Sequence, residues 1–267
     1  MAETLLVVDQ LEVSYHRVIT AVQGISLEVA RRRIVALLGT NGAGKTTTLR
    51  AISGFIGLDD ARVSDGRISY RGERIENQPP HRITARGIVL VPERDKVFQN
   101  LTVAENLEAS VPRRVAANER KHLAASVYEY FPALARVRAR EAGYLSGGER
   151  QMLGIASALM CAPELLLVDE LSLGLAPRIV EELMHRLLLI RDELGTTILL
   201  VEQNAAIALD IADYGYIIEN GRIVLDGTPE RLRGHQDIQE FYLGQGGGRR
   251  RSYRDVKQYR RSRRWFG

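Results

Sequence analysis

One glycine-rich segment of the chain has the residue types and the spacing that bind phosphate groups. The run "GTNGAGKTT", which begins at Gly39, matches the pattern G-x-x-x-x-G-K-[ST] in full. Its glycines allow successive backbone N–H groups to point toward phosphate oxygens. Lys45 supplies a positive charge for the β- and γ-phosphates, and the Thr46 hydroxyl is a Mg²⁺ ligand. The residues predicted to bind the nucleotide here are Gly39, Thr40, Asn41, Gly42, Ala43, Gly44, Lys45, Thr46 and Thr47.

Two adjacent carboxylates close an apolar run, "LLLVDE". Asp169 and Glu170 come at the end of what the sequence predicts as a buried strand. One carboxylate at such a place can join the Mg²⁺ shell while the other is aimed at an attacking water. Acidic pairs at strand ends are also common without any such role. The phosphate-binding segment in the same sheet favours the catalytic interpretation over the structural one.

A second segment that could bind an anion is "YLSGGERQ", from Tyr144 to Gln151. Ser146 and Glu149 have the spacing of a capping box at the start of a helix, and the two glycines between them leave backbone N–H groups uncovered. One triphosphate does not need two such segments in one chain. We therefore expect this segment to serve a nucleotide that is held by another subunit.

Four apolar segments predict the strands that position these residues. Residues 33–39, 87–93, 164–170 and 197–203 are nearly continuous Ile, Leu and Val, which is typical of parallel strands buried on both faces. Each segment ends in a glycine or a polar residue. Ligands collect at the carboxyl ends of the strands in such sheets, so the four ends are predicted to converge on one site.

The remaining sequence predicts two further parts. The first 30 residues and residues 66–75 hold short, partly alternating runs that indicate an antiparallel sheet beside the parallel one. Asn220-Gly221 lies between two strand-like runs and predicts a tight hairpin. Residues 101–160 are rich in helical patterns and poor in strands, so a helical lobe is predicted between two strands of the parallel sheet.

Composition limits the classes of protein to which the chain can belong. Cys161 is the single cysteine, so no internal disulfide can form and a reducing compartment is expected. No apolar run approaches the roughly 20 residues of a spanning helix, and the N-terminus lacks the features of a signal peptide. Any membrane role is therefore expected to go through partners. The five histidines have no metal-ligand spacing.

The C-terminal segment carries the excess of positive charge. Residues 245–267 hold nine Arg and Lys against Asp255 alone, whereas the rest of the chain is net acidic. The glycines at its start predict a flexible hinge. Three interpretations stay open for this tail: a solvated arm, contact with an anionic membrane leaflet through its arginines and Trp265-Phe266, and binding of nucleic acid.

Taken together, "GTNGAGKTT", "LSGGERQ" and "LLLVDE" resemble the ATP-binding subunit of an ABC transporter, over about residues 4–240. The resemblance implies an α/β protein with the parallel sheet core of a P-loop NTPase, an antiparallel β subdomain and an inserted helical subdomain. It places an ABC ATP-binding domain at residues 1–244, with the helical subdomain at about 96–160. The basic tail at 245–267 follows it.

The resemblance also implies roles for single residues. Tyr15 stands where the family stacks an aromatic ring on adenine, with a strand-end aromatic as the plainer alternative. Glu170 would polarise the hydrolytic water, and the "LSLGLAP" that follows it would contact the partner subunit. The residues implied to bind ATP held by the opposite subunit are Ser146, Gly147, Gly148 and Glu149, and those implied for Mg²⁺ are Thr46, Asp169 and Glu93.

Two positions depart from the usual pattern of the family, which generally has Gln in place of Glu93 and His in place of Gln203. With "VPERDKVFQNLTVAENL" and "VEQNAAIAL", this combination is similar to the branch that serves branched-chain amino acid importers and their urea and amide relatives. Leu171 differs from that branch, which usually has Pro. Glu93 is predicted to help hold the Mg²⁺-bound water, and a simple loop carboxylate is the alternative.

Gln203 differs in its chemistry from the histidine that the family generally has at this position. An amide can donate and accept hydrogen bonds at once, but it does not titrate near neutrality as imidazole does. We therefore predict that Gln203 positions the water or the γ-phosphate while Glu170 remains the base. A solvated strand end is the alternative.

Together with the motifs, the resemblance implies an ATPase on the cytoplasmic face of the cell (inner) membrane that uses ATP and Mg²⁺ to power an importer for branched-chain or hydrophobic amino acids. The predicted partners are a second ATP-binding subunit, either a paralogue or another copy, in a nucleotide-sandwich dimer, two transmembrane permease subunits and, indirectly, a solute-binding protein. No specific nucleic acid is expected. The alternatives are uptake of urea or short amides by the same family, and a non-transport ABC ATPase that acts on nucleic acid or ribosomes. A small-molecule kinase would leave "LSGGERQ" unexplained.

Overall fold

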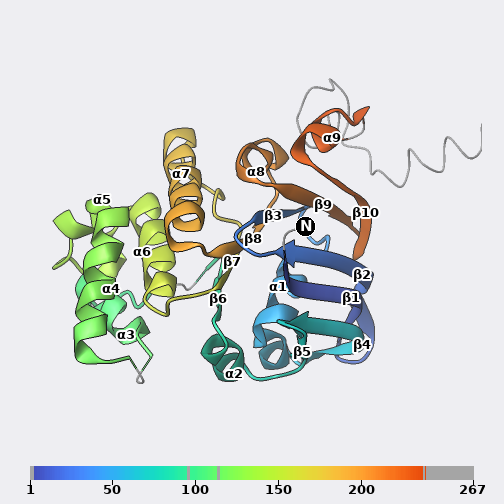
Figure 1. Ribbon diagram of the computed structural model, residues 1–267, viewed down its shortest axis with the longest axis horizontal. Coiled ribbons are helices and arrows are strands. Elements are labelled where there is room, and N and C mark those ends of the chain that lie inside the picture. The colour runs from blue at the N-terminus through green and yellow to red at the C-terminus, as the bar shows by residue number, and fades with distance from the viewer. Residues whose placement is uncertain (1–2, 95–96, 113–114, 237, 239–267) are drawn as a thin grey trace, which may run out of the picture.

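The computed structural model describes residues 3–94, 97–112, 115–236 and 238, which form two sheets and the helices around them (Figure 1). The basic segment at 245–267 lies outside the described residues, as does the predicted domain boundary at residue 244. Within the described part, no helix has both the length and the apolar character needed to cross a membrane.

A six-stranded sheet runs through the middle of the molecule in the order β10-β9-β3-β8-β7-β6. Its neighbours pair in parallel, except for the antiparallel β9–β10 hairpin. The four strands predicted from the apolar runs are confirmed, each one to three residues shorter than its run. The strands are β3 (Ile34–Leu38), β6 (Ile88–Val91), β7 (Leu165–Asp169), β8 (Thr197–Glu202), β9 (Tyr214–Glu219) and β10 (Arg222–Gly227).

Both faces of this sheet are buried because successive side chains of each strand enter two different apolar cores. On β3, Ala36 and Leu38 join the core beneath the helical lobe, whereas Val35 and Leu37 join the core shared with the antiparallel sheet. Every residue of β3, β7 and β8 is buried. The near-continuous apolar runs in the sequence follow from this two-sided burial.

The antiparallel sheet has the strand order β2-β1-β4-β5 and lies beside the parallel one (Figure 1). Its prediction from the first 30 residues and residues 66–75 is confirmed, and β4 begins five residues before the expected run. The strands are β1 (Thr4–Tyr15), β2 (Ile19–Ala30), β4 (Ala61–Tyr70) and β5 (Glu73–Arg74).

Helices cover the parallel sheet on both faces. In α7, the buried residues Val180, Leu183, Met184 and Leu187 recur at helical spacing and enter the core beneath the helical lobe. On the other face, α1 supplies Leu49, Ala51 and Ile52 to the core shared with the antiparallel sheet. These helices and 3-10 segments are α1 (Lys45–Ser53), η1 (Phe55–Asp59), α2 (Pro80–Ala85), α7 (Pro177–Leu194), α8 (Ala205–Ile211) and α9 (Pro229–Arg233).

The helical lobe lies between β6 and β7 in the chain and at one side of the molecule (Figure 1). The amide of Asn106, which is 1% exposed, donates to the carbonyl oxygens of Phe98 and Leu101, at 3.0 and 3.1 Å, and accepts from the Phe98 N–H at 2.7 Å. These contacts hold the loop that leads from β6 into the lobe. Its elements are α3 (Val103–Ser110), α4 (Ala117–Tyr130), α5 (Pro132–Arg136), η2 (Ala142–Tyr144) and α6 (Gly147–Leu159).

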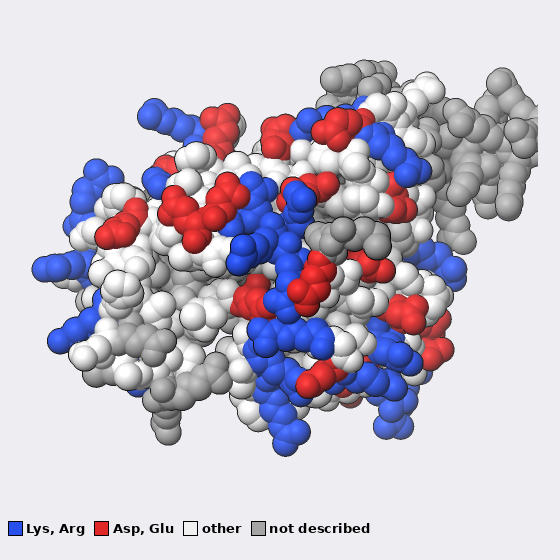
Figure 2. Space-filling model, in the orientation of Figure 1, with Lys and Arg blue, Asp and Glu red and all other residues white. Residues whose placement is uncertain are grey.

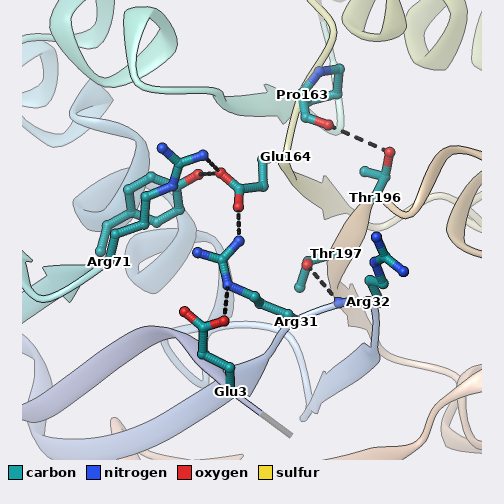
Figure 3. A network of polar contacts seen from close by, with 9 residues as sticks. Glu3, Arg31, Arg32, Arg71, Pro163, Glu164, Thr196 and Thr197 are labelled. Atoms are coloured by element: carbon teal, nitrogen blue, oxygen red, sulfur yellow. Dashed lines mark hydrogen bonds and ion pairs between the residues drawn. The ribbon is translucent and has the colours of Figure 1, made fainter.

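One carboxylate joins the two sheets at the end opposite the phosphate-binding segment. Figure 2 shows Lys and Arg side chains gathered across the middle of one face, with Asp and Glu side chains among them. Glu164, just before β7, forms ion pairs with Arg31, after β2, and Arg71, after β4 (Figure 3). It also accepts from the Tyr70 hydroxyl at 2.7 Å. Burial raises the pKa of Glu164, but the donors from Tyr70 and the two arginines outweigh it and hold the pKa below its ordinary value.

We predict that Glu164→Gln lowers the free energy of unfolding at neutral pH by about 1–3 kcal/mol, a range reduced for the solvent that reaches Arg71. Because the folded-state pKa is lowered, this stabilisation is present above the unfolded-state pKa and is lost as pH falls through the folded-state value. Urea unfolding of both proteins from pH 7 to pH 3 measures the difference, which should shrink below about pH 4. Glu181→Gln, at an exposed carboxylate on α7, is the control, and equal losses for the two variants would contradict the prediction.

Candidate functional site

The phosphate-binding segment begins where β3 ends at Leu38 and wraps around the start of α1. Gly44 precedes the helix with a φ of 107°, a conformation that favours glycine. At Gly39 a Cβ atom would lie 2.4 Å from the backbone oxygen of Ile218, so only glycine fits there without a shift of the backbone. The chain therefore needs glycine at both ends of the segment, one for its conformation and the other for the close approach of β9.

The β9–β10 hairpin supports this segment from behind. Asn220 and Gly221 have φ values of 48° and 75°, which confirms the tight hairpin predicted from the sequence. The Gly221 N–H donates to the Ala43 carbonyl at 2.9 Å, and the Gly221 carbonyl accepts from the Gln23 N–H at 2.7 Å. A turn more than 170 residues away in the sequence thus connects the phosphate-binding segment to β2.

Lys45 lies buried beneath the segment, 4% exposed. Its Nζ donates to the carbonyl oxygens of Gly39 and Thr40 at 2.8 and 3.1 Å, and forms an ion pair with Glu170 at 2.9 Å. The side chain of Glu170 is 9% exposed. The strand ends at β3 and β7 are therefore joined by one buried charge pair.

Asp169 and Thr46 face each other across the same gap. The Thr46 hydroxyl donates to Asp169 Oδ1 at 3.2 Å. Burial is the main reason why the pKa of Asp169 is raised to about 6, and the charges of Glu170 and Glu93 raise it further, against the Thr46 hydrogen bond and Lys45, which lower it. The site holds more negative charge than Lys45 alone balances, so a bound cation would stabilise it.

The structure brings several of the predicted site residues around one pocket of about 280 Å³. Glu93 reaches it from the end of β6, half-buried and paired with Arg94 at 3.0 Å. Ala21 of β2 forms part of the wall, which the sequence analysis missed because nothing in an apolar strand residue marks it. The lining residues are Ala21, Asn41, Gly42, Gly44, Lys45, Thr46, Thr47, Glu93 and Glu170.

Gln203 and Tyr15 are not among the residues that line this pocket. Gln203 follows β8 and is half-buried. The Tyr15 hydroxyl hydrogen-bonds Thr47 Oγ1 at 3.2 Å, so its ring lies beside the start of α1. Their roles therefore stay predictions.

The segment from Ser146 to Glu149 also lies outside the pocket. Ser146 accepts from the Glu149 N–H at 3.2 Å, and Glu149 accepts from the Ser146 N–H at 2.8 Å, which is the capping box predicted from the sequence. Ser146 and Gly147 are exposed, whereas Gly148 is buried against Ile179. This helix start thus presents exposed backbone to the surroundings, away from the lysine and the carboxylates of its own chain.

One buried carboxylate near the site has no counterpart among the predicted residues. Glu202, the last residue of β8, is fully buried and accepts from Ser172 N at 2.9 Å and Ser172 Oγ at 2.6 Å. Burial raises the pKa of Glu202, while the two donors of Ser172 lower it. A glutamate that closes an otherwise apolar strand, one residue before Gln203, was the available signal in the sequence.

Comparisons with known proteins agree with this geometry. The family described as ABC transporter matches residues 22–172. The chain is 41% identical over 231 residues to the "High-affinity branched-chain amino acid transport ATP-binding protein BraG" of Pseudomonas aeruginosa, covering 86% of this chain and 96% of the relative. It is 39% identical to the "Probable branched-chain amino acid transport ATP-binding protein LivF" of Archaeoglobus fulgidus, covering 82% and 91%.

Solved structures show the same fold. The ADP conformation of an ATP-binding cassette of an ABC transporter aligns with a TM-score of 0.77 and 26% identity, over 91% of this chain and all of that one. A second solved structure, of an ATP-binding subunit of an ABC transporter, aligns with a TM-score of 0.74 and 28% identity, over 90% of this chain and 97% of that one. With its phosphate-binding segment, its paired carboxylates and these likenesses, the chain belongs to the ABC transporter family, as an ATPase of the branch of branched-chain amino acid transport ATP-binding proteins.

Proposed function

We propose that this ATPase binds Mg²⁺-ATP between itself and a second ATP-binding subunit and powers the import of branched-chain or hydrophobic amino acids through transmembrane permease subunits. The observation that carries the proposal is that the groups predicted to contact the nucleotide lie in two separate places on the chain. Lys45, Thr46, Glu93 and Glu170 surround one pocket, whereas the exposed helix start at Ser146 lies outside it. A chain built in this way needs another copy, or a similar chain, to complete each nucleotide site.

The donor set fits Mg²⁺. The described residues hold no cluster of three or more His, Cys, Asp or Glu that could bind a metal alone. Mg²⁺ does not need one, since it is commonly held by one or two carboxylates together with the phosphates of the substrate and water. Thr46, Asp169 and Glu93 would hold it here, and it would neutralise the charge that develops on the phosphates.

The ion pair between Lys45 and Glu170 indicates how binding prepares the site. Both side chains are buried, so neither can leave the other without a new partner. A phosphate oxygen near Lys45 would supply that partner and would release the Glu170 carboxylate toward the attacking water. Glu170 would then accept a proton from the water while Lys45 stabilises the phosphates.

The lining of the pocket supports a site for the phosphates. The residues around its volume of about 280 Å³ belong to the phosphate-binding segment, together with Ala21, Glu93 and Glu170. Tyr15 is not among them, so the base and ribose would lie beyond the pocket, with Tyr15 as the residue on which adenine stacks. Ser146, Gly147 and Gly148 of the opposite subunit would contact the γ-phosphate through uncovered N–H groups.

The solute is proposed from the names of the relatives, and import is proposed from the resemblance of the sequence to the branch that serves branched-chain amino acid importers. Two of them, from a bacterium and an archaeon, carry branched-chain amino acid transport in their names and match this chain over more than four-fifths of its length. The test is affinity purification of the full chain from gently solubilised native membranes. Two multi-span proteins and a second ATP-binding protein are expected. Ribosomal or DNA-bound partners without a membrane protein would overturn the transport proposal and leave the ATPase intact.

We predict that Glu170→Gln lowers ATP turnover by about 10²–10⁴-fold, because the amide cannot accept the proton of the attacking water. The variant should still bind ADP, since the phosphate-binding segment is unchanged. Turnover of purified protein and calorimetric titration with ADP separate the two effects. Glu93→Gln, at the other carboxylate that lines the pocket, is the control and should lose less turnover. Equal losses for both variants would remove Glu170 from the role of base.

We also predict that Gln203→His is tolerated better than Gln203→Ala in ATP turnover. Imidazole and amide side chains can both hydrogen-bond a water or a γ-phosphate oxygen, whereas a methyl group cannot. The measurement is kcat at saturating ATP for the three proteins. If all three turn over equally, Gln203 is a solvated strand end with no positioning role.

A further inference from the structure

Glu202 is a buried carboxylate to which the proposed function gives no part in binding the nucleotide or the metal. It is fully buried at the end of β8, where the preceding residues Ile198–Val201 enter the two cores. A buried charge is costly unless it is hydrogen-bonded, and apolar residues of similar size would often serve stability as well. The two hydrogen bonds of Glu202 to Ser172 are therefore the contacts for which this burial needs an explanation.

Ser172 stands two residues after Glu170 in the loop that follows β7. Glu170 itself has a φ of 47°, a left-handed backbone conformation that costs energy for a residue other than glycine. Strand β8 holds this turn on both sides. Before the turn, the Val201 carbonyl accepts from the Glu170 N–H at 2.9 Å, and after it, the Glu202 side chain accepts from Ser172 N and Oγ. The strained turn that directs Glu170 toward Lys45 is thus fixed by consecutive residues of one strand.

Glu202 also lies next to the phosphate-binding segment. Its backbone carbonyl accepts from the Gly39 N–H at 3.4 Å, a longer contact than those to Ser172. The strand end therefore touches the first residue of the segment through its backbone and the turn of Glu170 through its side chain. A movement of Glu202 would change the position of both relative to each other.

The loop held by Glu202 packs against the exposed helix start at Ser146. A Cβ atom on Gly147 would lie 3.2 Å from Leu175, and one on Gly148 would lie 2.7 Å from Ile179. The two glycines therefore approach the loop and the first turn of α7 closely. One continuous stretch, from Glu170 to Ile179, connects the base of this subunit with the segment that serves the other subunit.

From these contacts we propose that Glu202 is a positioning residue for hydrolysis: through its two hydrogen bonds to Ser172 it fixes the turn that aims Glu170 and anchors the loop beneath the Ser146 helix start. The inference rests on the proposed function, because it assumes that Glu170 is the base. It predicts an effect on turnover that is separate from binding. The carboxylate acts through Ser172 and touches neither the nucleotide nor the water.

The first variant removes one of the two hydrogen bonds between Ser172 and Glu202 and leaves the Glu202 side chain in its place. In the full-length chain, Ser172→Ala deletes the hydroxyl that donates at 2.6 Å and keeps the backbone contact. We expect kcat for ATP to fall about tenfold, since small misplacements of a catalytic group have effects of this order or larger. KM and the calorimetric affinity for ADP should stay within about twofold. Ser172→Thr keeps the hydroxyl and should restore kcat to within about threefold of the wild type.

A second variant addresses Glu202 directly. Glu202→Gln preserves the shape of the side chain, and its amide oxygen can accept from Ser172 N while its NH₂ donates to the Ser172 hydroxyl. We expect this variant to fold and to retain turnover within about threefold, whereas Glu202→Ala should lose at least as much kcat as Ser172→Ala.

The matched control lies on the same strand. Thr197, 1% exposed at the other end of β8, accepts from the Arg32 N–H at 2.9 Å (Figure 3). Thr197→Val therefore removes one partly buried hydrogen bond at the end of the strand opposite Glu202. It should lower the Tm and leave kcat unchanged. If Ser172→Ala only lowers the Tm, as Thr197→Val does, the positioning role is overturned while wild-type hydrolysis upholds the proposed ATPase site. If the wild-type chain neither binds nor hydrolyses ATP, the proposed function and this inference fail together.

Discussion

The burial of both faces of the six-stranded sheet is the constraint on which the rest of the structure depends. Alternate residues of β3, β7 and β8 enter two apolar cores, so these strands cannot shift in register without moving apolar side chains out of one core into the other. Because these strands are parallel, their carboxyl ends meet at one edge. Lys45, Asp169, Glu170 and Glu202 lie there because the sheet holds them there, and each residue needs only a short turn to reach its place.

At this edge of the sheet, the described residues carry more negative than positive charge. One buried lysine faces a carboxylate pair, with Glu93 nearby, and burial raises the pKa of Asp169 to about 6. In the proposed function, substrate phosphates would add further negative charge, which a cation and the groups of a second subunit would offset. The same imbalance favours the pairing of Lys45 with Glu170 in a single chain. In the proposed function, a phosphate near Lys45 would separate the two side chains.

The end of strand β8 carries, beside Gln203, a second polar residue that the sequence analysis did not single out. The sequence draws attention to Gln203, which follows an apolar run and replaces a residue that can titrate. In the structure Gln203 is half-buried outside the pocket, whereas its neighbour Glu202 holds Ser172 through two hydrogen bonds. The residue that best explains the shape of the site is thus one whose partner lies 30 residues earlier in the chain. Its contact also joins the Glu170 turn to the loop near Gly147 and Gly148.

The sequence by itself determined the features that depend on neighbouring residues. The phosphate-binding segment, the Ser146 capping box, the Asn220-Gly221 hairpin and the four core strands follow from local conformational preference and from apolar runs, because each is stabilised within a short stretch. Only the tertiary structure decided which distant groups meet. The support of Ala43 by Gly221, the pairing of Lys45 with Glu170 and the contact of Glu202 with Ser172 join strand ends far apart in sequence. Such contacts are set by strand order and register, and no local pattern of residues specifies these.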